Sequence, residues 1–201
     1  MNLNKVVLIP DSFKGTLTSL EICNIITDKI NKHFPRCNVL SIPVADGGEG
    51  SVDCFLSALG GEKVYETVNS PYFEDMESFY GLIGDTAVIE TAACAGLPLV
   101  EDRKDPSLTT TFGVGQLILA AVNKGCKRII VGLGGSSTND GGCGAAAAAG
   151  VKFYDKKGNE FIPVGRTLKN IEKIDFSKKT KKLNNIEIIT MCDIDNPMYG
   201  P

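Results

Sequence analysis

The glycine-rich segment from Gly132 to Gly142 has the composition of a loop that binds oxyanions. It follows an apolar run at 128–132 that predicts a buried strand, and it leads into an alanine-rich helix predicted at 144–149. Glycines let backbone N–H groups approach a ligand closely, hydroxyl groups add donors, and a helix N-terminus contributes partial positive charge. The segment lacks the third glycine of a dinucleotide fingerprint and the Gly-Lys-Ser/Thr ending of a P-loop. A glycine-rich turn that serves only tight packing is therefore the alternative.

Asp11, Ser12 and Lys14 follow the first predicted strand, an apolar run at 6–9 that ends at Pro10. Open α/β sheets place their ligands at the carboxyl ends of strands. The ammonium group of Lys14 is a compact charge that can neutralise a carboxylate or a phosphate. An exposed lysine ahead of a helix is an equally natural interpretation, because most lysines lie on the surface.

Two acidic residues, Asp46 and Glu49, follow the second predicted strand at 39–44 and are separated by glycines. Carboxylates in that position suit a magnesium site or a base for a substrate hydroxyl. Acidic residues are also common in turns for purely local reasons, so the sequence leaves both interpretations open.

A third polar cluster contains Asp193, Asp195 and Asn196, directly after the last predicted strand at 186–191. Hard oxygen ligands at strand ends are what a metal–nucleotide complex needs, because phosphoryl transfer depends mainly on positioning and charge neutralisation. For the threonines at 109–111, capping of the next helix is the first interpretation and contact with substrate oxygens the second. His33 is the only histidine, lies on a predicted surface helix and is not expected to be catalytic.

The elements that position these residues alternate between strand and helix at the start of the chain, which is typical of a parallel sheet. Thr18 and Glu21 have capping-box spacing ahead of an amphipathic pattern, and a helix at 52–59 is ended by Gly60 and Gly61. From about residue 64 the pattern changes to short extended segments at 64–68, 77–83 and 86–91. We therefore predict an α/β protein with a domain boundary near residue 70, and assign 1–70 to one domain and 71–201 to a second α/β domain.

The composition excludes several classes of function. The net charge is -3 with a pI near 5.3, so a nucleic-acid partner is not expected. The N-terminus lacks the pattern of a signal peptide, and no apolar run is long enough to span a membrane. The seven cysteines are scattered without a C-x-x-C pair, which argues against zinc and disulfides and predicts reduced thiols in the cytoplasm.

Six segments of the chain resemble the type I glycerate kinases, and they occur in that family's order over the whole chain. They are Pro10–Gly15, Asp46–Gly50, Ile89–Ala93 with Gly96–Leu99, Thr109–Gly113, Gly132–Gly142, and Cys192–Asp193 with Asn196–Pro197. The resemblance implies a Rossmann-like domain interrupted by a second α/β domain, with the active site in the cleft between them. It also implies magnesium-dependent transfer of the ATP γ-phosphate to D-glycerate, giving 2-phosphoglycerate.

Site residues follow from the same resemblance, position by position. It implies catalytic roles for Lys14, Asp46 and Asp193, with Asp46 and Asp193 as metal ligands. Which of the two aspartates is the base stays open. The binding residues that it implies are Asp11, Ser12, Gly47, Gly48, Glu49, Gly134, Gly135, Ser136, Asn139 and Thr110.

The chain departs from the family pattern in length, because family members continue with another long segment that completes the first domain. We therefore expect that the first domain is incomplete here, and that residues 1–201 alone bind substrate weakly or are inactive. A non-catalytic module that binds a sugar acid or a nucleotide is the alternative function, and another hydroxy acid is the alternative substrate. Self-association through an open sheet edge is a further expectation.

Overall fold

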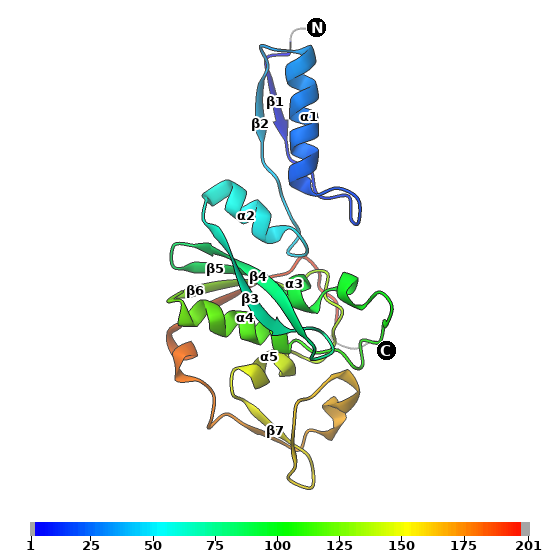
Figure 1. Ribbon diagram of the computed structural model, residues 1–201, viewed down its shortest axis with the longest axis vertical. Coiled ribbons are helices and arrows are strands. Elements are labelled where there is room, and N and C mark those ends of the chain that lie inside the picture. Colours follow the sequence, from blue (N-terminus) through cyan, green and yellow to red (C-terminus); the bar gives the residue numbers. More distant parts are fainter. Residues whose placement is uncertain (1–2, 198–201) are drawn as a thin grey trace.

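The computed structural model describes residues 3–197 and confirms the predicted α/β class. The described part contains a two-stranded, a five-stranded and a three-stranded sheet (Figure 1). Figure 1 shows the two-stranded sheet as an arm at one end of the molecule, the five-stranded sheet in the middle and the three-stranded sheet at the opposite end.

The N-terminal arm is a strand–helix–strand unit made of β1 (Lys5–Leu8), α1 (Ser19–His33) and β2 (Asn38–Ser41). The two strands are parallel and pair from Lys5 opposite Asn38 to Leu8 opposite Ser41. The predicted capping box at the start of α1 is confirmed, because the Thr18 hydroxyl accepts the Glu21 N–H and the Glu21 carboxylate accepts the Thr18 N–H.

The arm leaves apolar side chains uncovered. Val7 is 47% exposed and Leu40 is 45% exposed. Parallel sheets are normally buried on both faces, and a two-stranded sheet alone is marginally stable. The arm therefore lacks the cover that such a sheet usually has.

The central sheet has the strand order β10-β6-β5-β4-β3. The strands are β3 (Glu62–Asn69), β4 (Asp75–Ile83), β5 (Thr86–Glu90), β6 (Arg128–Gly132) and β10 (Glu187–Met191). The β3–β4 and β4–β5 pairs are antiparallel, whereas β5, β6 and β10 are parallel to one another. The carboxyl ends of β5, β6 and β10 therefore meet at one edge of the sheet.

The hydrophobic core lies between this sheet and α4 (Phe112–Asn123), whose apolar residues the sequence pattern predicted as a helix. Tyr80, Ile89, Leu117 and Ile129 have no exposed surface there. On the other side, α2 (Ser51–Leu59) packs over β4 and β5 (Figure 1). Helices on both sides keep the central strands dry, as their continuous apolar sequences require.

The remaining elements lie around this core. They are α3 (Ala92–Ala95), η1 (Leu97–Val100), α5 (Cys143–Ala148), β7 (Lys152–Tyr154), β8 (Glu160–Phe161), η2 (Gly165–Asn170), β9 (Lys173–Asp175) and η3 (Lys181–Asn185). Within residues 3–197, we find no helix with the length and hydrophobicity of a membrane span.

The boundary predicted near residue 70 falls inside the β3–β4 hairpin, where Asn69 pairs with Asp75. Since β3 belongs to the central sheet and not to the arm, we propose that the boundary lies instead in the extended segment 42–50 that connects the two (Figure 1). The end of the second domain predicted at residue 201 lies outside the described residues. The sequence pattern located the strand at 62–69 but held no information on its partner.

Candidate active site

The ion pair between Lys14 and Asp46 joins the first two polar clusters. Lys14 Nζ lies 3.1 Å from Asp46 Oδ2, across 32 residues of sequence. The other carboxylate oxygen of Asp46 accepts the N–H of Gly48 at 3.0 Å. This N–H, and next the Lys14 ammonium, hold the pKa of Asp46 below its usual range, so Asp46 is a carboxylate at neutral pH.

The glycine-rich segment contacts the loop that carries Asp46. Gly134 donates its N–H to the carbonyl of Gly47 at 3.1 Å. A Cβ on Gly134 would lie 2.7 Å from the Gly48 nitrogen, and one on Gly132 would overlap the Gly47 carbonyl. Only glycine allows the two backbones to approach this closely.

The end of β10 brings the third cluster to the same place. Leu133 donates its N–H to the Met191 carbonyl at 3.1 Å, and a Cβ on Gly47 would lie 2.9 Å from that carbonyl oxygen. Asp193 follows two residues later, and its charge contributes to the raised pKa of Lys14, after the larger effects of Asp46 and Asp11. Asp11, Asp46 and Asp193 therefore all lie near enough to Lys14 for their charges to raise its pKa.

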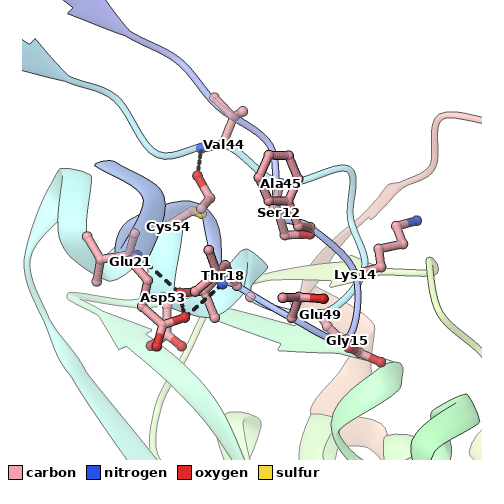
Figure 2. A pocket seen from close by; sticks show the side chains of 16 residues that line it. Ser12, Lys14, Gly15, Thr18, Glu21, Val44, Ala45, Glu49, Asp53 and Cys54 are labelled. Atoms are coloured by element: carbon pink, nitrogen blue, oxygen red, sulfur yellow. Dashed lines mark hydrogen bonds between the residues drawn. The ribbon is translucent and has the colours of Figure 1, made fainter. Parts of the chain in front are cut away.

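Beside this group lies a pocket of about 290 Å³ between the loop at 12–18 and α2 (Figure 2). Ser12, Lys14 and Glu49 are the predicted site residues that line it. In Figure 2 the Lys14 side chain points away from Glu21 and Asp53 on the far side of the pocket. Asp46, Gly135 and Asp193 are not among the residues that line this pocket, whereas the carboxylates of Glu21, Glu49 and Asp53 are.

The loop around Gly135 presents free backbone donors. Gly135 has a φ of 69°, and neither its N–H nor that of Ser136 has an acceptor among residues 3–197. The Ser136 hydroxyl shares a hydrogen bond of 2.9 Å with the Thr138 hydroxyl. Exposed N–H groups in a glycine turn are the arrangement that binds phosphate oxygens, so this loop suits a nucleotide.

Two predicted binding residues lie apart from this group. Thr110 has no exposed surface; its hydroxyl donates to the Asp140 carboxylate at 3.5 Å and accepts the Phe112 N–H at 3.1 Å. Its side chain is therefore buried and already paired, and contact between Thr110 and substrate stays a prediction. Asn139 is exposed at the other end of the glycine-rich segment, where its carbonyl lies beside Gly165.

The residues fit a magnesium ion that is bound mainly through other oxygens. Within residues 3–197 there is no group of three or more His, Cys, Asp or Glu side chains arranged for a metal. Mg²⁺ typically takes one or two carboxylates and completes its shell with phosphate oxygens and water. Asp46 and Asp193 are the two carboxylates that the sequence suggested for this role, and their binding of magnesium stays a proposal.

Comparison with known proteins supports the resemblance seen in the sequence. The model of the glycerate kinase family matches residues 6–201. The chain belongs to the glycerate kinase family. It is 42% identical to a glycerate kinase from Bacillus subtilis and 41% identical to a glycerate 2-kinase from Escherichia coli, each over 98% of this chain. A crystal structure assigned as glycerate kinase 2 from Salmonella typhimurium LT2 matches with a TM-score of 0.83 and 40% identity over 99% of this chain.

The chain spans about half the length of the glycerate kinases that it matches. It covers 52% of the Bacillus subtilis and Escherichia coli proteins, and 54% of the Salmonella typhimurium chain.

Two buried carboxylates of this glycerate kinase family member, Asp140 and Glu90, have no role predicted from the sequence. Asp140 is 1% exposed and accepts the N–H groups of Thr111, Gly142 and Gly144. It thereby ties the start of α4 to the start of α5. Glu90 is 3% exposed at the end of β5. A charged residue at the end of a buried apolar run was the available signal for Glu90, but no sequence pattern indicated its hydrogen-bond partner.

Replacing Lys14 by methionine is expected to raise the pKa of Asp46 only in part. The Gly48 N–H, which lowers that pKa most, remains in the variant. Because the pKa is lower in the folded state, these contacts stabilise the fold above the unfolded-state pKa, and their contribution is lost as the pH falls through the folded pKa. NMR titration of the Asp46 carboxyl carbon measures the shift, with Lys29→Met on α1 as the control. A pKa that stays unchanged in Lys14→Met would contradict the ion pair.

Proposed function

We propose that residues 1–201 form part of the active site of an ATP-dependent glycerate kinase, which transfers the γ-phosphoryl group to D-glycerate and gives 2-phosphoglycerate. The observation that carries the proposal is the junction of three strand-end loops: the Lys14–Asp46 pair, the glycine-rich loop packed against Gly47 and Gly48, and the segment leading to Asp193. Such junctions at strand ends are the usual ligand site of open α/β sheets.

The carboxylates have different surroundings, which supports different roles. Asp46 is held by the Gly48 N–H and the Lys14 ammonium, and its lowered pKa makes it a weak base but a good ligand for a cation. Asp193 is exposed and makes no hydrogen bond or ion pair among the described residues. We therefore favour Asp193 as the base for the substrate hydroxyl and Asp46 as the metal ligand.

The other residues bind and neutralise charge. Lys14 supplies a positive charge for the substrate carboxylate or a phosphate. Asp11 and Ser12 on the same loop, and Glu49 on the turn that contains Asp46, are proposed to contact the hydroxyl groups of the substrate. The free N–H groups of Gly135 and Ser136 bind phosphate oxygens, and a Mg²⁺ ion held by Asp46 would supply charge neutralisation for the nucleotide. Positioning of this kind provides most of the catalysis in phosphoryl transfer.

A non-catalytic module that binds a sugar acid or nucleotide is the second candidate function, because the same polar loops could hold a ligand without transferring a phosphoryl group. Another hydroxy acid as substrate is compatible with the same side chains. The seven cysteines are free thiols, in keeping with the expected reduced compartment; location in the cytoplasm and self-association stay predictions.

Calorimetric titration of the chain with D-glycerate, and then with ATP and MgCl₂, separates these functions. We expect both ligands to bind weakly, the nucleotide only in the presence of Mg²⁺, because residues 1–201 supply only part of the proposed site. Binding of glycerate alone would favour the module. Binding of neither ligand by a folded chain would count against the proposed site.

A further inference from the structure

Glu90 is a buried carboxylate without a cationic partner. It is 3% exposed, and none of the ion pairs within residues 3–197 includes it. Lys63 on β3 is instead paired with Asp53 at 2.8 Å. A carboxylate is retained in such a place only if strong hydrogen bonds compensate for its desolvation.

The compensating donors are at the start of α2. The N–H of Val52 donates to Glu90 Oε1 at 2.6 Å, across 38 residues of sequence. The N-cap of α2 is Gly50, which has no side chain and a φ of 86°, so the helix has no capping side chain of its own. Glu90 fills that role from the central sheet, and its negative charge faces the positive end of the helix dipole.

The turn held in this way is the one that presents the candidate site residues. The segment from Asp46 to Ser51 contains Asp46 and Glu49. Within it the Gly48 N–H donates to Asp46 Oδ1 at 3.0 Å, and the N–H and the hydroxyl of Ser51 both donate to the Gly48 carbonyl, at 3.3 and 2.8 Å. On the sheet, Glu90 pairs with Gly132, the residue where the backbone of the glycine-rich segment meets Gly47. The Glu90 side chain therefore fixes the Asp46 turn next to the glycine-rich loop.

We infer that Glu90 is a positioning residue: by holding the Val52 N–H, it fixes the Asp46 turn against the end of the sheet and so sets the contact of Asp46 with Gly48 and Lys14. The consequence for catalysis rests on the proposed function, but the positional effect does not. Glu90 touches none of the groups proposed to bind ligands, so it acts through the turn.

The electrostatics favour a role that depends on the hydrogen bond more than on the charge. Burial raises the pKa of Glu90, and the N–H groups of Val52 and Gly50 oppose that rise. Asp53 on α2 raises this pKa as well, and Lys63 lowers it slightly. A neutral side chain with an acceptor oxygen in the same place avoids the desolvation cost and still accepts the Val52 N–H. Glutamine therefore preserves the function that alanine removes.

Amide hydrogen exchange tests the hydrogen bond directly. In Glu90→Ala we expect the Val52 amide to exchange at least about tenfold faster than in the unaltered chain, because a buried N–H loses its acceptor. In Glu90→Gln we expect it to stay within about threefold. Gln116→Ala is the matched control, because Gln116 Oε1 accepts the Asn69 N–H at the same 2.6 Å on the opposite side of the sheet. That variant should speed exchange at Asn69 and leave Val52 unchanged.

The pKa of Asp46, measured by NMR titration in the same variants, tests the positioning. We expect Glu90→Ala to move it toward the ordinary value as the Gly48 and Lys14 contacts loosen, and Glu90→Gln and Gln116→Ala to leave it low. A uniform increase of exchange throughout the sheet with an unchanged Asp46 pKa would show a structural role only and overturn the inference. Neither measurement involves glycerate or ATP, so a failure of the proposed kinase function would leave their outcome standing.

Discussion

Residues 1–201 alone are expected to phosphorylate D-glycerate at least about 10³-fold more slowly than a chimera in which the second half of the Bacillus subtilis glycerate kinase follows them. The chain covers 52% of that protein. The arm has an uncovered apolar face, and β10 is an edge strand whose Ile188 and Ile189 are 47% and 40% exposed. Each is a place where further polypeptide would pack, and a site missing one side holds its reactants in poor geometry.

A coupled assay of glycerate-dependent ATP turnover measures the difference, with circular dichroism to confirm that both proteins are folded. Co-expression of the two halves as separate chains provides a second form of the completed enzyme. Equal turnover by residues 1–201 alone would show that this half is sufficient. A folded but inactive chimera, with an equally inactive co-expressed pair, would count against the proposed reaction.

Local elements of the fold were predictable because the sequence patterns that indicate them span only a few neighbouring residues. The capping box of Thr18 and Glu21 predicted the start of α1, and the alternation of apolar runs with glycine turns located the central strands. Strand pairing was not predictable in the same way. β3 joins β4 rather than the arm because of contacts that no local pattern encodes, which is why we propose a boundary earlier than residue 70.

The candidate site shows the same division. The rule that ligands bind at strand ends placed Lys14 and Asp46 in one region from the sequence, and the structure pairs them directly. For Thr110 the residue type suggested substrate contact, but burial decides its role, and burial depends on the partner, Asp140. Glu90 was missed because its function lies in one hydrogen bond across 38 residues.

Substitution of Asp193 by asparagine in the chimera is expected to lower kcat by about 10² to 10⁴, because removal of a general base costs that much. The effect of this substitution on the KM for Mg·ATP should be small if Asp193 acts on the substrate hydroxyl.

Asp46→Asn in the same chimera is expected to raise the KM for Mg·ATP and the Mg²⁺ concentration needed for activity. The substitution removes a charged cation ligand whose pKa the Gly48 N–H and Lys14 keep low. Asp28→Asn, at an exposed position on α1, is the control.

The roles of the two aspartates can be distinguished by kinetics. Both substitutions remove one negative charge, so a difference between the variants reflects the different contacts of Asp46 and Asp193. Steady-state kinetics with Mg²⁺ and ATP varied separately give kcat and KM for each variant. If Asp46→Asn lowers kcat at saturating Mg·ATP while Asp193→Asn changes only the KM, the assignment is reversed. Asp46 would then have to accept a proton although two contacts lower its pKa and so make it a weak base, which would require the Lys14 ion pair to open when substrate binds.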